Sequence, residues 1–188
     1  GRLLLGIIVL TFTIYLIPGL WGAPLKIISG FPPPLQYSES PDGIGSSGGL
    51  NTSVDSNLPE GADYGPHDLV SFHDYEQGMA YAEKQNLPVL LDFTGHACVN
   101  CRKMEERVWS EDEVLNLLKN DIVLISLYVD DQRDLPEHEQ YVSEATGKEI
   151  ETIGNKWSDF QITNYKANAQ PYYVLLDNEG NKLNDPFD

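Results

Sequence analysis

The sequence predicts an α/β fold in which a central mixed sheet is flanked by helices. Three observations lead to this prediction. A short apolar run, PVLLDF, precedes a helical segment that begins at the first of two cysteines, and a second apolar run, IVLISLYVD, follows it. Strand, helix and strand in this order form a parallel unit with a crossover connection. Near the end of the sequence, QPYYVLLDNEGNKL has the pattern of a hairpin, which adds antiparallel pairing.

The amino-terminal segment is a nearly continuous apolar run from Leu3 to Ile17. Its length reaches the lower limit for crossing a bilayer, which takes about 17 to 25 residues. We interpret residues 1–30 as a transmembrane segment and its exit, the last span of a longer membrane domain. The alternatives are a signal peptide, although GLWGAPL is a poor cleavage site and the first residue is not Met, and a buried helix of a soluble protein. Arg2 on one side and an acidic continuation on the other predict that most of the chain lies outside the cytoplasm.

Residues 31–66 are rich in Pro, Gly, Ser and Asp and lack apolar periodicity. Such a segment cannot bury enough apolar surface to offset the entropy lost on ordering, so we predict a disordered linker. Residues 67–188 are predicted to form one folded domain. The chain carries 29 Asp and Glu against 12 Lys and Arg, a net charge of −17. This balance argues against a nucleic acid as partner, because phosphate binding requires clustered cations.

The first helices and strand of the domain follow from periodicity and capping signals. HDYEQGMAYAEKQN has Tyr75, Met79 and Ala82 at helical spacing, and PVLLDF has the character of a short buried strand. CVNCRKMEERVW predicts a helix that begins at the first cysteine. SEDEVLNLLKN predicts another helix, with Ser110 as its cap and Glu113 as the capping-box partner.

The second half of the domain is predicted to contain a strand, an insertion, a helix and a hairpin. IVLISLYVD is the second buried strand, and residues 131–155 after it are too long for an ordinary connection. KWSDFQITNY predicts a short helix. The hairpin has its first strand at residues 172–176, its turn at residues 178–180 and its second strand from Asn181.

Both cysteines lie in one motif, Cys98-Val99-Asn100-Cys101. A structural disulfide across so short a loop would constrain the unfolded chain little. A zinc site would need two further ligands, and the four histidines show no paired spacing. A redox site fits better, because the start of a helix stabilises a thiolate and the second sulfur lies one turn below the first. Cys98 would then be the attacking thiol and Cys101 the resolving thiol.

Asp92 interrupts the apolar run PVLLDF, where a buried carboxylate is costly unless it has a partner or a function. It comes six residues before Cys98, at the end of a strand that leads into the helix, so it can lie beneath the two sulfurs. Burial would raise its pKa and suit it to accept the proton of Cys101 during exchange. The alternative is an edge position that faces water.

The order of strand, buried acid, CxxC helix and a later proline that opens a strand resembles the thioredoxin fold. The closer resemblance is to the carboxy-terminal periplasmic thioredoxin-like domain of the thiol:disulfide interchange protein DsbD family. It rests on LDFTGHACVNCRKME, WSEDEV and ANAQPYYVLLDNEG, and it covers roughly residues 68–188. The apolar run at the amino terminus fits the last span of that family's membrane domain. The final helix of a thioredoxin fold is missing after the hairpin, so we expect a truncated piece of a larger protein.

The resemblance implies a catalytic role for four residues. Cys98 and Cys101 match the redox pair, and Asp92 matches the buried acid. Glu105, seven residues after Cys98, matches a second acid near the site. Two carboxylates near a thiol disfavour the thiolate, so the pKa of Cys98 should be higher than the helix start alone would give. The alternative for Glu105 is a solvated helical face.

The resemblance also implies a substrate-binding surface. Pro171 matches the cis-proline that faces the disulfide, and it leaves the backbone of Gln170 available to pair with a bound partner. Ala97 stands where thioredoxins usually carry tryptophan, which alters the surface next to the sulfur. His96 could tune Cys98 or contact a partner, although a loop histidine that faces water is the simpler interpretation. The basic pair RK after the second cysteine is expected to form an exposed face.

The function implied by the resemblance is that of a membrane-tethered periplasmic protein-disulfide reductase. The membrane domain would pass two electrons from a cytoplasmic thioredoxin to Cys98 and Cys101, which would reduce periplasmic disulfide proteins and support cytochrome c maturation. We expect a bacterial inner-membrane location, no metal, and no cofactor besides the redox-active disulfide. A stand-alone disulfide isomerase or oxidase on the same fold is an alternative. So is a binding module whose CxxC holds a metal or a structural disulfide.

Overall fold

The computed structural model describes residues 1–21, 25, 28 and 58–186. Most of the predicted linker therefore lies outside the described residues. At the amino terminus, helix α1 (Arg2–Leu16) continues into a 3-10 turn over Ile17–Trp21. The span Arg2–Leu20 is long and apolar enough to cross a membrane, and none of it is buried. It fits either a membrane anchor or a signal sequence.

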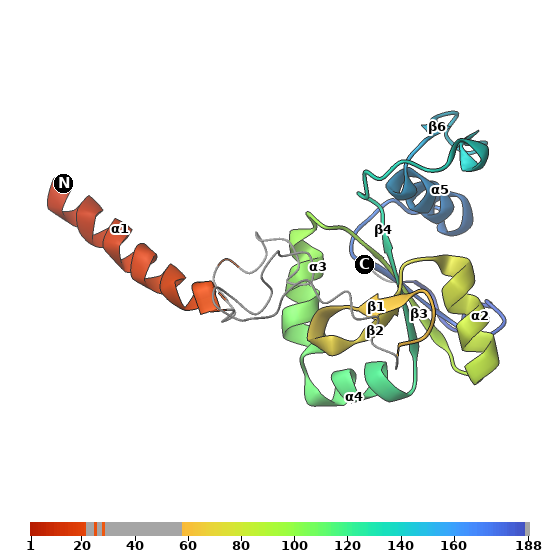
Figure 1. The fold of residues 1–188 in the computed structure, drawn as a ribbon, viewed down its shortest axis with the longest axis horizontal. Helices are drawn as coiled ribbons and strands as arrows, with labels where there is room; N and C mark the ends of the chain where they lie inside the picture. The colour runs from red at the N-terminus through yellow and green to blue at the C-terminus, as the bar shows by residue number, and fades with distance from the viewer. Residues whose placement is uncertain (22–24, 26–27, 29–57, 187–188) are drawn as a thin grey trace.

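A five-stranded sheet in the order β1-β2-β4-β3-β7 forms the centre of the domain (Figure 1). Strand β4 is parallel to both of its neighbours, β2 and β3, whereas β1 with β2 and β3 with β7 are antiparallel. The predicted mixed sheet is thus confirmed. Its strands are β1 (Ala62–Tyr64), β2 (Val70–Phe72), β3 (Val89–Thr94), β4 (Val123–Tyr128) and β7 (Tyr172–Leu176).

Helices cover both faces of this sheet (Figure 1). On one face, α2 and α5 pack over an apolar cluster that includes Phe72, Phe93 and Trp157. On the other face, α3, a π-helical turn and α4 pack over a smaller cluster that includes Trp109 and Tyr173. The helical elements are α2 (Tyr75–Gln85), α3 (Val99–Met104), the π-helical turn (Glu105–Trp109), α4 (Asp112–Asn120) and α5 (Ile153–Tyr165).

The alternation of side chains along β3 determines on which face of the sheet Asp92 lies. Leu91 and Phe93 belong to the cluster under α2 and α5, whereas Leu90 packs against the cluster under α3 and α4. Successive residues of a strand point to opposite faces, so Asp92 shares the face of Leu90. Asp92 therefore lies on the side of the helix that begins at the cysteines.

The predicted helix that begins at the first cysteine is confirmed, because Cys98 is the N-cap of α3. The predicted cap of α4 is wrong. Helix α4 begins at Asp112 with Glu111 as its N-cap, and the Ser110 hydroxyl instead donates to the Glu106 carbonyl oxygen at 2.6 Å. Serine side chains compete for nearby carbonyls in this way at the end of a preceding helix.

Two predicted boundaries also differ from the structure. Strand β1 lies within residues 31–66, which the sequence assigns to the linker, yet it pairs with β2, so the sheet begins before residue 67. The second strand of the predicted hairpin is not formed as a regular strand. After β7, the Asp177 carboxylate accepts the amides of Glu179 and Asn181, and only an isolated bridge joins Leu176 to Lys182.

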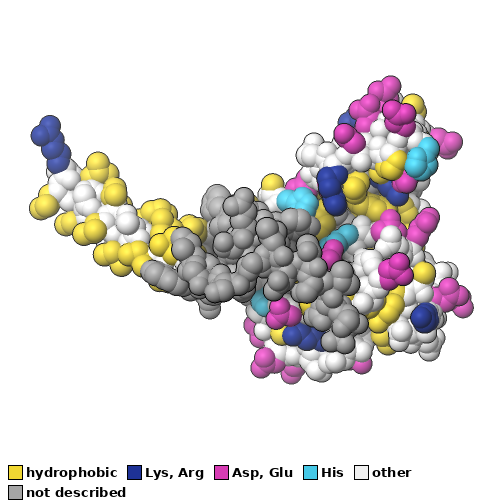
Figure 2. Space-filling view, viewed as in Figure 1, with side chains coloured by type: hydrophobic (Ala, Val, Ile, Leu, Met, Phe, Trp, Pro, Cys, Tyr) yellow, Lys and Arg dark blue, Asp and Glu magenta, His cyan; other side chains and the backbone are white. Residues whose placement is uncertain are grey.

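The predicted insertion contains a small sheet of its own. Strands β5 (Tyr141–Val142) and β6 (Glu149–Ile150) pair antiparallel, after a 3-10 turn at Glu137–Glu139. Acidic side chains gather over this part of the molecule (Figure 2). Helix α5, which follows, is longer than the short helix predicted from KWSDFQITNY.

A buried carboxylate ties the insertion to α5. Asp159 is 8% exposed, and its two oxygens accept hydrogen bonds from two hydroxyls of the insertion. The Tyr141 hydroxyl donates to Oδ2 at 2.9 Å, and the Ser143 hydroxyl donates to Oδ1. The charge of Asp159 is therefore matched by donors on both oxygens.

Candidate active site

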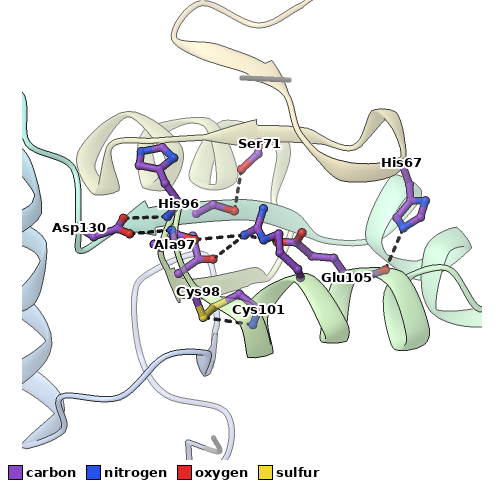
Figure 3. Close-up of polar contacts among 12 residues, drawn as sticks. His67, Ser71, His96, Ala97, Cys98, Cys101, Glu105 and Asp130 are labelled. Atoms are coloured by element: carbon purple, nitrogen blue, oxygen red, sulfur yellow. Dashed lines mark hydrogen bonds and ion pairs between the residues drawn. A yellow bond between two sulfur atoms is a disulfide. The ribbon is translucent and has the colours of Figure 1, made fainter. Parts of the chain in front are cut away.

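The two cysteines form a disulfide at the start of α3, with a Cα to Cα distance of 5.3 Å (Figure 3). Cys98 is partly exposed, whereas Cys101 is 1% exposed. The Cys98 sulfur accepts the backbone N–H of Cys101 at 3.1 Å. The sulfur of Cys98 is therefore the one that a partner protein can reach, and the helix start directs an amide at it.

Asp130, two residues after the end of β4, organises the loop that leads into Cys98. Its carboxylate accepts the backbone N–H of His96 at 2.8 Å and that of Ala97 at 2.9 Å (Figure 3). The loop and carboxylate are so close that a Cβ on Gly95 would lie 2.9 Å from Asp130 Oδ2. Sequence reasoning missed Asp130, although an acid directly after a buried parallel strand adjacent to β3 was a usable signal.

The two residues before Cys98 differ in environment. His96 is half-buried, and its ring stacks on Tyr128 with 4.2 Å between ring centroids. Burial lowers the pKa of His96, and the nearby Asp130 opposes this. His96 is therefore only partly exposed to water, whereas the sequence predicts a histidine that faces water. Ala97 is exposed beside the disulfide.

Asp92 lies in the protein interior on the α3 side of the sheet. It is 2% exposed, and its Oδ1 has no hydrogen-bond partner among the described residues. Burial raises the pKa of Asp92 to about 7, and the positive charge of Arg102 and the Ser126 hydroxyl offset part of that rise. The alternative of an edge position facing water is wrong. A carboxyl with this pKa can accept and return a proton near neutral pH.

Arg102 is buried, at 4% exposed, and joins α3 to the end of β3. Its Nη2 lies 2.7 Å from Glu105 Oε1 in an ion pair. The same nitrogen donates to Thr94 Oγ1 at 3.2 Å and to the Gly95 carbonyl oxygen at 3.5 Å. The exposed basic face predicted for the RK pair is therefore wrong for Arg102, whereas Lys103 is exposed as predicted.

Glu105 is the second buried acid of the site, at 6% exposed. The solvated helical face considered for it is therefore wrong. Burial raises the pKa of Glu105, the ion pair with Arg102 opposes that rise, and the negative charges of Asp92 and Glu106 add to it. The backbone of Glu105 is also held, because His67 Nε2 donates to its carbonyl oxygen at 2.8 Å (Figure 3).

Pro171 is preceded by a cis peptide bond from Gln170. The ladder between β3 and β7 ends at the pair Phe93 and Tyr172, so Pro171 lies just beyond it, at the end of the sheet where β3 leads into the cysteine loop. Gln161 Nε2 donates to the Ala169 carbonyl oxygen at 2.9 Å and holds the segment before the proline. The predicted substrate-binding residues thus come from two loops at one end of the sheet.

Within the described residues, no group of three or more His, Cys, Asp or Glu side chains is arranged to hold a metal ion. The two buried acids of the site are instead influenced by one guanidinium, that of Arg102. The arrangement can support exchange between thiols and disulfides, and Asp92, on the sheet face that α3 covers, can serve as a proton acceptor.

The chain was compared with protein families and with solved structures. A family model described as thioredoxin-like matches residues 69–150, a range that contains both cysteines and both buried acids of the site. A DsbH oxidoreductase structure is 18% identical, with a TM-score of 0.43 over 61% of this chain and 69% of that chain. A thioredoxin from Thermus thermophilus is 20% identical, with a TM-score of 0.42 over 62% of this chain and 72% of that chain. No curated protein matches the sequence.

The sheet topology and the family match together define the fold of the domain. Residues 58–186 carry a thioredoxin-like α/β domain. Its CxxC pair is a disulfide at the start of a helix, which is the arrangement of a thiol:disulfide oxidoreductase.

Proposed function

We propose that this protein is a membrane-tethered periplasmic thiol:disulfide reductase that relays electrons to partner proteins through Cys98 and Cys101. The observation that carries the proposal is the disulfide at the start of α3, in which Cys98 is partly exposed and Cys101 is buried. The resemblance of LDFTGHACVNCRKME to the DsbD family supports the relay role, which includes cytochrome c maturation. The apolar helix α1 supports the tether.

The exchange reaction proceeds in two steps from the reduced protein. The Cys98 thiolate attacks a partner disulfide, forms a mixed disulfide and releases the partner's second sulfur. The Cys101 thiol then gives its proton to the Asp92 carboxylate and attacks Cys98 Sγ. The bond between Cys98 and the partner breaks, and the Cys98–Cys101 disulfide re-forms. In total, two electrons pass to the partner, whose two sulfurs leave as thiolates and take up protons from the solvent and from Asp92. A dithiol of the membrane domain restores the two electrons.

The charges near the sulfurs support the proposed direction, which is reduction of the partner. The buried carboxyls of Asp92 and Glu105 disfavour a negative sulfur, and they counteract the amides of the helix start. A cysteine pair whose thiolate is weakly stabilised is the stronger reductant. Thioredoxin, a reductant, has a reduction potential of about −270 mV, whereas DsbA, an oxidant whose reduced form is stabilised, has one of about −120 mV.

The proposal is tested by trapping the mixed disulfide. The Cys101→Ser variant of the full chain, reduced and mixed with insulin as a disulfide substrate, should accumulate an adduct that dithiothreitol dissolves. The wild-type chain should reduce insulin without accumulating the adduct, and the Cys98→Ser variant should form none. An adduct through Cys101 in the Cys98→Ser variant, with none in the Cys101→Ser variant, would overturn the assigned roles.

A further inference from the structure

Arg102 is the one Lys, Arg or His side chain among the buried residues of the described chain. It brings its positive charge into the interior, because a guanidinium does not lose its proton in proteins. Such a charge is costly to bury unless it is paired. Its Nε and Nη1 have no hydrogen-bond partner among the described residues, and only Nη2 contacts an acid directly. A buried guanidinium with two nitrogens that lack a partner is unexpected for a side chain that only stabilises the fold.

The position of Arg102 connects the helix of the cysteines, the second acid and the start of the cysteine loop. It comes directly after Cys101, and it lies on the same helical face as Cys98 and Glu105, at spacings of four and three residues. It donates to Thr94 and Gly95, which begin the loop before Cys98. The guanidinium therefore fixes the second acid and the cysteine loop relative to each other.

We propose that Arg102 is a positioning residue for disulfide exchange, whose buried cation sets the pH at which Asp92 takes the proton of Cys101. This inference rests on the proposed function. The cation favours the carboxylate form of Asp92, whereas the negative charge of Glu105 disfavours it. The ion pair between Arg102 and Glu105 keeps these two opposing influences side by side.

The other titratable and charged groups around the two acids come from several elements. Tyr173 on β7 is the ladder neighbour of Asp92, and burial raises the pKa of its hydroxyl, so it stays neutral during exchange. Glu106 adds negative charge beside Glu105, and His67 contacts the Glu105 carbonyl oxygen. None of these groups is a buried cation, so Arg102 has no substitute in this role among the described residues.

The test follows the second step of exchange in the reduced full chain in detergent micelles. Excess 5,5′-dithiobis(2-nitrobenzoate) converts Cys98 to a mixed disulfide and releases one thionitrobenzoate ion. Attack by Cys101 then releases a second ion, which stopped-flow absorbance resolves as a unimolecular phase. The pH at which this phase reaches half its maximum rate is measured for each variant.

Arg102→Met should raise the midpoint by about one pH unit, and Glu105→Gln should lower it, because the two side chains carry opposite charges. The double variant should return towards the wild-type midpoint. Lys103→Met, which removes an exposed cation from the next position, should leave the midpoint unchanged. Opposite shifts that cancel are not expected from a side chain that only stabilises the fold.

The proposed function and the role of Arg102 are contradicted by different results. A wild-type chain that releases a single thionitrobenzoate ion would overturn the proposed function itself. A wild-type chain with both phases, together with Arg102→Met and Glu105→Gln midpoints that are unshifted or shifted in the same direction, would overturn the role of Arg102 alone. Thermal unfolding of each variant verifies that the compared chains are folded.

Discussion

Two buried aspartates of this domain, Asp92 and Asp159, have different environments. Asp159 in α5 accepts a hydroxyl on each of its oxygens, from the two side chains that anchor the insertion. Asp92 on β3 is more deeply buried and has one oxygen without a partner. A satisfied buried carboxylate stabilises a fold, whereas an incompletely satisfied one beside a disulfide is typical of a site that moves protons. This difference indicates that Asp159 stabilises the fold and that Asp92 takes part in proton transfer.

The largest expected effect is a gain of stability in Asp92→Asn. Because its pKa in the folded protein, about 7, is above its unfolded value, folded Asp92 holds a proton that the unfolded chain loses between about pH 4 and pH 7. Its contribution to stability is therefore most favourable in acid and is lost as pH rises. Asp92→Asn should stabilise the protein by about 4 kcal/mol at pH 8.5 and by little at pH 4.

Urea unfolding of the full chain, followed by tryptophan fluorescence at both pH values, measures this difference. The same variant should slow the second phase of exchange, because Asn cannot accept the proton of Cys101. If Asp92→Asn and the wild type had the same free energy of unfolding at pH 8.5, burial of the Asp92 carboxylate would not destabilise the protein.

Asp159→Ala should have the opposite effect on stability. It leaves the buried Ser143 hydroxyl without its acceptor, and we expect a loss of about 3 kcal/mol. Both phases of the thionitrobenzoate assay should be unchanged at temperatures where the variant is folded. A changed pH midpoint in Asp159→Ala would contradict the separation of the two acids.

Asp130 is the intermediate case, since its oxygens are satisfied but lie next to the disulfide. Asp130→Ala removes the acceptor of two loop amides and should slow the first phase of exchange several-fold, with a stability loss of about 2 kcal/mol. Asp130→Asn keeps one acceptor oxygen and should recover part of the rate. Equal rates in Asp130→Ala and the wild type would remove Asp130 from the site.

The sequence predicted the parts of the fold that have strong local signals. The apolar run around Asp92 and the run that forms β4 indicated two buried strands, and the CxxC motif after the first indicated a helix start. The burial of Asp92 followed from the cost of an acid in an apolar strand. These signals depend on neighbours in sequence, so the sequence alone contains them.

The remaining site residues depend on contacts between distant segments. Arg102 looked solvent-exposed beside Lys103, although its spacing from Cys98 and Glu105 places it on the inner face of the helix. Asp130 acts on a loop more than thirty residues earlier in the chain, and only the parallel pairing of β3 with β4 brings them together. The hydroxyl partners of Asp159 come from an insertion without clear periodicity.

The central claim is that Cys98 and Cys101 form a redox pair that reduces its partners. Equilibration of the full chain with defined dithiothreitol mixtures, followed by alkylation of the free thiols, gives the reduction potential of the pair. The account predicts a single two-electron transition closer to about −270 mV than to about −120 mV. A reduction potential of about −120 mV would indicate an oxidase. Cysteines whose redox state does not change across the dithiothreitol mixtures would contradict the redox function.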